Sequence, residues 1–440
     1  MERGIYLKQL TRRHFLKAAG AAVIAAACGV YEFIPGTKSL VGQAVKTTKA
    51  TAAHYNLTSA VDAANIRQII TADSSTSRTI MWQSAYAEKG AAVEYRAAGA
   101  EDTLTIPAAD TELNDDGTMT YIYSAAITGL TPGGSYEYRV GYTDRRSEWF
   151  PLKTAAGSTF KALIFPDSQS ADYGVWKNTA MPAWERNKDA QFFINIGDLV
   201  DNGQSGYQWN AWFEGCEDMI RQIPLVPLDG NHEMYDLNWQ MHLPVSYTTL
   251  FDLPKNGLPE YPDQFYSFDY GDIHFTVLDT QFTELKDFEP DLLKDEVTWV
   301  KKDLEKTEKK WKIVLMHKDI LAYGEYQIDQ QTQHGISDVG HIFMDVFDAL
   351  DIDLVVTGHV HAYRRRQIRA HQTDPHGTLY LLAGPGGNEY FDVPAEIYDL
   401  AASPNPAPSN YLYMEADVHR LHICCESLDG TVIDTIELRK

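Results

Sequence analysis

Cysteine is scarce in this sequence. Its 440 residues include four cysteines, Cys28, Cys216, Cys424 and Cys425, and no two of them form a CxxC pair. This spacing supports neither a zinc ribbon nor a thioredoxin-like redox site. Cys424 and Cys425 are adjacent in an alternating segment, so we expect their side chains on opposite faces of a strand. At these two positions and at Cys216 we expect ordinary, partly buried thiols.

Basic residues are also in the minority. Lysine and arginine number 38 against 61 aspartates and glutamates, which gives a formal net charge of −23. Nucleic-acid binders usually carry basic patches, so this balance argues against a polynucleotide substrate. An acidic protein that binds phosphate needs local positive charge, which metal ions can supply. The same acidic surface would also simply keep an exported protein soluble.

The composition is otherwise that of a soluble globular protein. Hydrophobic residues make up 44% and charged residues 22% of the chain. The length allows two or three domains at roughly 100–200 residues each.

Residues 1–28 have the features of an export signal. The basic segment 11–17 (TRRHFLK) precedes an alanine-rich run over 18–27, which is too short to span a bilayer at about 20 residues. The arginine pair resembles a twin-arginine signal and predicts export by that machinery to the periplasm, the cell surface or the medium. Cys28 follows three alanines, so both lipid acylation of Cys28 and plain cleavage nearby remain open. Residues 29–50 are expected to form a linker.

Residues 51–155 are predicted to form a β module. Short β-type runs occur at 79–83, 92–96 and 136–140, with turn signals at 115–117 and 131–134. Strands at this spacing are typical of a β-sandwich. The stretch 127–140 resembles the late strands of a fibronectin type III domain. Histidines and carboxylates with ligand spacing are missing from this sequence segment, which favours a structural or docking role.

Residues 160–440 alternate apolar runs with amphipathic stretches, as in an α/β layered core. The apolar runs at 160–165, 191–196, 225–228, 311–316 and 354–357 each lead directly into polar residues. In open α/β sheets, ligands bind beyond the carboxyl ends of the strands, so we expect these polar groups to face one site. The candidates in chain order are Asp167, Gln169, Asp198, Asp201, Asn231, His232, His317, His359 and His361.

These donors predict a metal site. Carboxylates and imidazoles suit Zn, Fe and Mn, and the lack of thiolates argues against a purely structural zinc site. Glycines before Asp198, Asn231 and His359 are expected to let the backbone turn so that each side chain faces the site. One such motif alone would fit a turn or a buried core histidine, but five in order are hard to obtain by chance.

The ordered motifs resemble those of the calcineurin-like metallophosphoesterases, and the chain from about 50 to 440 resembles their purple acid phosphatase branch. The resemblance implies an N-terminal all-β sandwich, fibronectin III-like, over 51–155. It also implies an α/β metallophosphoesterase domain over 160–440, built as a β-sandwich flanked by helices. The segments 411–418 and 431–436 are expected to be closing strands of that core.

By the same resemblance, the site holds two metal ions, Fe, Mn or Zn, which share Asp198. A metal-activated hydroxide would attack phosphorus, and His232 would donate a proton to the leaving oxygen. The remaining implied ligands are Asp167 and His361 for the first metal and Asn231, His317 and His359 for the second.

Two positions depart from the family pattern. Gln169 stands where many relatives have His, so Gln169 either ligates the first metal weakly or acts through water. Asp201 stands where purple acid phosphatases have the Tyr that binds iron and gives the colour. We therefore predict a colourless protein in which Asp201 orients His232.

Substrate contacts are predicted at Lys318, Tyr363 and Arg364, which follow the last two motifs, although 364–366 also fits an ion-paired run. The predicted function is hydrolysis of small phosphate monoesters by an exported enzyme. Phosphodiesterase or nucleotidase activity on the same site is the first alternative. A non-catalytic surface binding protein with a degraded metal site is the second.

Overall fold

The computed structural model describes residues 63–115, 117–170, 173–326 and 332–440. The predicted export signal, the linker and Cys28 lie outside the described residues. Among the described helices, none is both long enough and apolar enough to cross a membrane.

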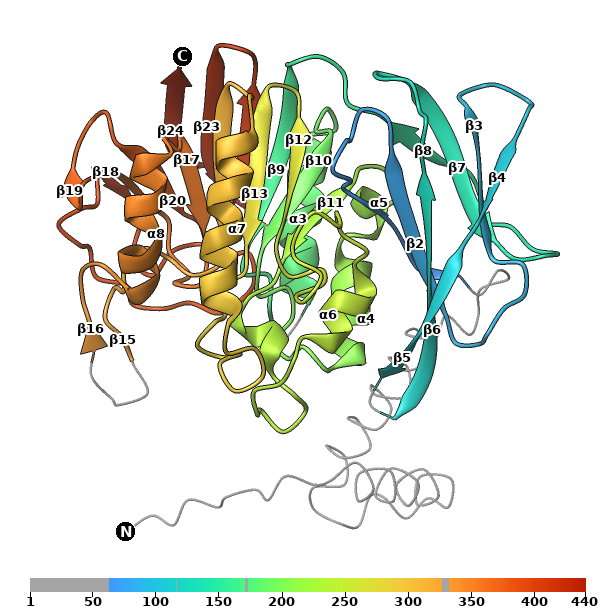
Figure 1. Cartoon of the computed structure of the whole chain (residues 1–440), viewed down its shortest axis with the longest axis horizontal. Helices are drawn as coiled ribbons and strands as arrows, with labels where there is room; N and C mark the ends of the chain where they lie inside the picture. Colours follow the sequence, from blue (N-terminus) through green and yellow to red (C-terminus); the bar gives the residue numbers. More distant parts are fainter. Residues whose placement is uncertain (1–62, 116, 171–172, 327–331) are drawn as a thin grey trace, which may run out of the picture. The chain divides into compact units, whose positions relative to one another are not determined.

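Two large sheets stack face to face and carry helices on their outer sides (Figure 1). The first sheet has the order β24 (Val432–Arg439), β23 (Arg420–Ser427), β22 (Asn410–Ala416), β9 (Phe160–Pro166), β10 (Phe192–Ile196), β11 (Leu225–Leu228), β1 (Ala64–Ile69), β2 (Arg78–Ser84), β6 (Thr118–Ile127) and β5 (Ala109–Asp115). The second has the order β12 (Tyr266–Tyr270), β13 (Ile273–Leu278), β14 (Trp311–Met316), β17 (Leu354–Thr357), β20 (Thr378–Leu382), β18 (Arg364–Arg369) and β19 (Gln372–Thr373), with β21 (Ala401–Ala402) beside β18.

The helices are short and cover the two outer faces. Figure 1 shows α7 (Leu292–Lys306) and α8 (Asp338–Ala349) in front of the second sheet. The other helical segments are α3 (Gly174–Arg186), α4 (Gly206–Gly215), α5 (Glu217–Ile220), the 3₁₀ turn η2 (Asn231–Met234) and α6 (Val245–Leu250). A small hairpin pairs β15 (Glu325–Tyr326) with β16 (Thr332–Gln333).

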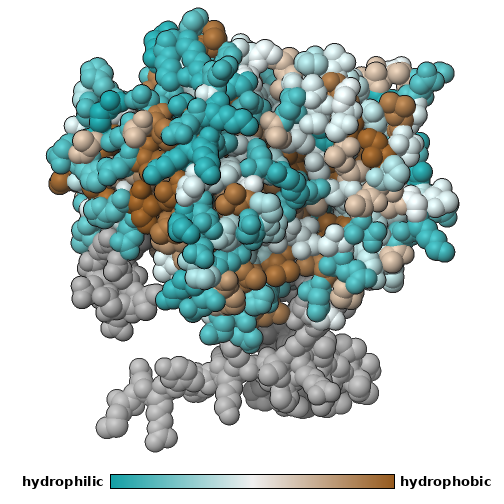
Figure 2. Space-filling view, in the orientation of Figure 1, coloured by the Kyte–Doolittle hydropathy of each residue, from teal (hydrophilic) through white to brown (hydrophobic). Residues whose placement is uncertain are grey.

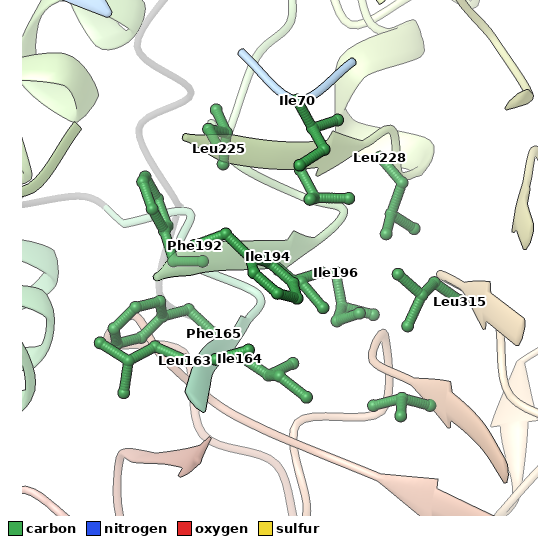
Figure 3. Close-up of a cluster of buried hydrophobic side chains, with 14 of the residues drawn as sticks. Ile70, Leu163, Ile164, Phe165, Phe192, Ile194, Ile196, Leu225, Leu228 and Leu315 are labelled. Carbon is green, nitrogen blue, oxygen red and sulfur yellow. The ribbon is translucent and has the colours of Figure 1, made fainter. Parts of the chain in front are cut away.

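The core lies between the sheets and under α3. All five residues of β10 are buried, as expected for a central parallel strand covered on both faces. On one face, Phe192 packs against Phe268 and Phe275 of the second sheet. On the other, Phe165 meets Trp176 of α3 edge to face. Figure 3 shows the labelled side chains of β9, β10 and β11 gathered with Leu315 of β14 into one apolar cluster.

The N-terminal module is a sandwich that shares a sheet with the rest of the chain. Its strands β1, β2, β6 and β5 continue the first sheet, because β1 pairs in parallel with β11 at Ile69 and Leu225. A separate sheet, β4 (Leu104–Pro107), β3 (Ala92–Ala97), β7 (Ser135–Gly141) and β8 (Phe150–Lys153), packs against them through a cluster that includes Trp82 and Tyr138. The predicted sandwich is confirmed, whereas its fibronectin type III character stays a prediction.

The five apolar runs that precede the motifs are β9, β10, β11, β14 and β17, so the predicted fold class is confirmed. Strands β9 to β11 belong to the first sheet and β14 and β17 to the second, as in the expected β-sandwich flanked by helices. Cys216, Cys424 and Cys425 are free thiols, and they are buried rather than partly buried.

Candidate metal centre

The predicted ligands meet at the carboxyl ends of strands from both sheets. Asp167 and Asp198 follow β9 and β10 of the first sheet, and His317 follows β14 of the second. Two groups have ligand atoms that all lie within 4.8 Å of one another. These groups are Asp198, His317 and His359 in the first case and Asp167, Asp198 and His361 in the second.

Four of these side chains leave the backbone at residues with positive φ. The φ angles are 32° at Asp167, 48° at Asp198, 75° at His359 and 53° at His361. A positive φ is uncommon for residues other than glycine, and such outliers gather at functional sites. Asp167 and Asp198 lie one and two residues past the ends of β9 and β10, and His359 and His361 lie two and four residues past the end of β17.

The glycines in the motifs act in two different ways. Gly197 has a φ of 72°, as the sequence predicted for a turn, and a Cβ there would lie 2.5 Å from His317 Nδ1. Gly230 has extended backbone, so a turn does not require it. Its role is close approach, because a Cβ at Gly230 would lie 2.1 Å from Asp198 Oδ1. Gly358 likewise needs no positive φ and lies against the Asp167 carboxylate.

Two histidines are oriented by backbone carbonyl groups. His317 Nδ1 lies 2.8 Å from the carbonyl oxygen of Ile196, and His361 Nδ1 lies 2.8 Å from that of Glu389. These contacts place the donor hydrogen on Nδ1 and leave Nε2 facing the carboxylates, which is the arrangement of metal-binding histidines. Burial lowers the pKa of His361 to about 4, so its ring is neutral and able to ligate at neutral pH.

The site contains more buried negative charge than its hydrogen bonds satisfy. Burial and the neighbouring charge of Asp198 raise the pKa of Asp167 well above its usual range. Asp167 Oδ1 accepts a hydrogen bond from the backbone N–H of His359 at 2.7 Å, but the buried Oδ2 has no hydrogen-bond partner. Burial would also raise the pKa of Asp198, but His317 and His232 lower it strongly.

This donor set fits two cations that share one carboxylate. Asp198 belongs to both groups, and His317 Nε2 lies 3.1 Å from Asp198 Oδ2 and 3.3 Å from Asn231 Oδ1. Buried carboxylates that face one another need positive charge between them. The unpartnered oxygen of Asp167 supplies a further open ligand position.

Gln169 also lies inside the group. Its amide nitrogen lies 3.3 Å from Asp198 Oδ2 and 3.0 Å from His361 Nε2. With the amide rotated by half a turn, the nitrogen would donate to the carbonyl oxygens of Asp198 and Asp167 and the oxygen would face His361 Nε2. Gln169 can therefore present either a donor or a ligand oxygen to the centre.

His232 lies at the edge of the centre beside Asp201. Its backbone N–H donates to Asp198 Oδ1 at 2.9 Å, and its Nδ1 lies 2.8 Å from the carbonyl oxygen of Asp201. The Asp201 carboxylate, which the sequence expected to orient His232, is further away at 3.6 Å. Burial lowers the pKa of His232, but the charge of Asp198 and the Asp201 carbonyl raise it to about 9.

The sequence analysis missed Glu233, which holds the backbone beneath Asp198. Its carboxylate accepts hydrogen bonds from the N–H groups of Asp198 (2.9 Å), Leu199 (2.9 Å), Val200 (3.2 Å) and Gly230 (2.7 Å). Its position directly after Asn231 and His232 was the only signal in the sequence. Glu233 is buried, and burial together with Asp198 raises its pKa to about 8.

The three predicted substrate contacts pair with other groups of the protein in this structure. Arg364 is buried, donates to the carbonyl oxygen of Val393 at 2.7 Å and pairs with Asp399, and the buried Tyr363 donates to Asp434 at 2.8 Å. Both side chains are buried and have partners inside the protein, so a substrate contact at either position stays a prediction. Lys318 is half-buried in a bidentate ion pair with Glu284 at 2.7 Å.

Comparison with known proteins identifies two domains. Residues 63–154 match the family described as purple acid phosphatase, N-terminal domain, and residues 169–363 match calcineurin-like phosphoesterase. Purple acid phosphatase 15 of Arabidopsis thaliana is 25% identical over 339 residues, which are 67% of this chain and 61% of that protein. Thus the chain spans about three-fifths of that curated relative.

Two solved structures share the fold. Purple acid phosphatase PPD1 from yellow lupin (Lupinus luteus) seeds matches with a TM-score of 0.73 and 19% identity, covering 86% of this chain and 75% of that one. PhoD matches with a TM-score of 0.60 and 13% identity, covering 85% and 90%. The resemblance predicted from the motifs is confirmed.

Proposed function

Because the chain joins a purple acid phosphatase N-terminal domain to a calcineurin-like phosphoesterase domain, we propose that it is an exported, binuclear metal-dependent hydrolase of small phosphate monoesters. The observation that carries this proposal is the position of Asp198, whose carboxylate belongs to both groups of candidate ligands. A carboxylate shared between two ligand groups is the arrangement that holds two cations close together.

The candidate ligands divide around Asp198. Asp167, His361 and the Gln169 amide lie on one side, and His317, His359 and Asn231 lie on the other. Oxygen and imidazole donors of this kind suit Fe, Mn or Zn. Two bound cations would supply Lewis-acid charge to the attacking and leaving oxygens of an in-line displacement.

The residues of the chain supply orientation and a proton. His232 is fixed by its Nδ1 contact with the Asp201 carbonyl, so Nε2 is the nitrogen left to donate a proton to the departing alkoxide. Glu233 fixes the backbone from which Asp198 projects. Burial of Asp167, Asp198, His317 and His361 keeps bulk water away from one side of the centre.

The test is hydrolysis of p-nitrophenyl phosphate by protein that has been stripped of metal and reloaded with Mn, Fe or Zn. We expect turnover only after reloading, binding of two metal ions per chain, and loss of both in Asp198→Asn. Asp102→Asn, which changes an exposed carboxylate of the N-terminal module, is the matched control. Preference for bis(p-nitrophenyl) phosphate would instead support a diesterase. Metal binding without turnover of either ester would support a binding protein.

A further inference from the structure

Two aromatic side chains stand beside His232. The ring of Tyr235 lies 5.6 Å from the His232 ring, and that of Trp239 lies 6.4 Å from it, both edge to face. The two aromatic rings are 5.4 Å apart. Trp239 is 44% exposed, which is unusual for so large an apolar side chain. Neither ring belongs to the buried clusters that the described residues form.

The turn that carries Trp239 is rigidly built. Trp239 has a φ of 59°, which is rare for a bulky residue. The Asp236 carboxylate accepts from the N–H groups of Asn238 (2.7 Å) and Gln240 (2.8 Å). The side chain of Asn202, next to Asp201, donates to the Asp236 carbonyl at 2.6 Å. The backbone that carries the exposed indole is therefore held by hydrogen bonds, and the indole lies beside the rings of His232 and Tyr235.

Two carboxylates, those of Glu389 and Glu284, lie within electrostatic range of His232 and Tyr235. Burial raises the pKa of Glu389, the charge of His232 lowers this pKa, and the charge of Asp201 raises it. These three residues therefore lie within electrostatic range of one another. Glu284 similarly contributes to the raised pKa of Tyr235, after burial. The nearby Lys318 already pairs with Glu284. Figure 2 shows hydrophilic residues over most of the visible face, with hydrophobic residues gathered in a few patches.

We propose that Tyr235 and Trp239 form an aromatic platform that binds a planar, uncharged ring on the leaving oxygen, which makes phosphate monoesters of aromatic alcohols the preferred substrates. This inference rests on the proposed function, because His232 marks the side on which the leaving oxygen departs. A ring joined directly to that oxygen lies within reach of Trp239, whose ring is 6.4 Å from His232. An aliphatic alcohol would leave the platform in contact with water.

The test compares two stable phosphonates that differ only in the ring. We would measure the Kd of phenylphosphonate and of methylphosphonate by calorimetry on metal-loaded protein. Stacking on one aromatic side chain gives about tenfold tighter binding, or about 1.4 kcal/mol, so the wild-type preference for phenylphosphonate should be at least about tenfold. Trp239→Ala should reduce the preference to about threefold or less, and Trp239→Phe should retain most of it.

Controls separate this inference from the proposed function. Tyr86→Ala removes an exposed aromatic side chain of the N-terminal module and should leave the preference unchanged. If Trp239→Ala binds the two phosphonates with the wild-type ratio, the platform is refuted. If the wild type hydrolyses p-nitrophenyl phosphate and binds methylphosphonate but shows no preference, only the platform falls. If neither phosphonate binds and no ester is hydrolysed, both proposals fall.

Discussion

Glu233→Gln should weaken both the fold and the metal centre. In its ionised form, above its pKa of about 8, Glu233 accepts two backbone N–H groups on each oxygen, from Asp198 and Gly230 on Oε2 and from Leu199 and Val200 on Oε1. A glutamine keeps one oxygen and turns an NH₂ group toward the other pair. Two buried N–H groups would then lose their acceptor and face a donor.

The size of the effect follows from those two lost hydrogen bonds. A buried donor left without a partner costs about 1–3 kcal/mol, so we expect the free energy of unfolding to fall by about 4 kcal/mol. Asp198 has a positive φ that this contact supports, so the carboxylate should also lose its position. Loss of a supporting contact of this kind lowers metal affinity by about 10- to 100-fold.

Urea unfolding above pH 8, where Glu233 is ionised, followed by tryptophan fluorescence would give the stability, and metal titration into stripped protein at the same pH would give the affinity. Glu260→Gln, at an exposed position, is the control and should change neither. Lower stability with unchanged metal affinity would mean that Glu233 serves the fold alone. No change in either quantity would refute the reasoning from the four backbone contacts.

Three further predictions concern other parts of the structure. We expect Asp201 to stand where purple acid phosphatases have their iron-binding Tyr, so the metal-loaded protein should show no visible charge-transfer band, and a band in the absorption spectrum would contradict this. His232→Asn should lower kcat toward p-nitrophenyl phosphate by about 10²–10⁴-fold with little change in metal content, because it removes a proton donor; an unchanged kcat would exclude that role. Burial lowers the pKa of His274, but hydrogen bonds to Asp269 and Asp303 raise it to about 9. Because the pKa of His274 is higher in the folded protein than in the unfolded chain, the protonated ring adds up to about 3 kcal/mol to the free energy of unfolding. This stabilisation is complete below pH 6.5 and is lost as pH rises through about 9. His274→Gln should flatten that part of the stability curve measured by urea unfolding.

The sequence predicted the strands before the motifs because their signal is local. Each is a short, mainly apolar run that is followed by a polar group, as β10 is by Asp198. The pairing between strands is not local. Strand β1 joins the first sheet through Ile69 and Leu225, which are far apart in the chain. Nothing in the sequence around either residue indicates that the two pair. The shared sheet therefore appears only in three dimensions.

The burial of Tyr363 and Arg364 could not be predicted for the same reason. Both follow His361 closely in the sequence, which suggested a common site. His361 has a φ of 53°, and Arg364, the first residue of β18, is buried. Arg366 on that strand is also buried and pairs with Asp319, so a run that looks like a charged surface is an interior feature.

The strain at the centre and the strength of the core are linked. Non-glycine residues with positive φ cost about 1 kcal/mol or more each, and Asp167, Asp198, His359 and His361 all adopt it. The unpartnered buried oxygen of Asp167 adds to that cost. Such a set of conformations persists only where the surrounding structure determines it, and here each residue follows a fully buried strand end. Metal binding would remove the unfavourable electrostatic energy of the buried carboxylates. The strain of the positive-φ residues is offset by the packing of the two sheets. The ligand positions are therefore set by the core before any metal binds.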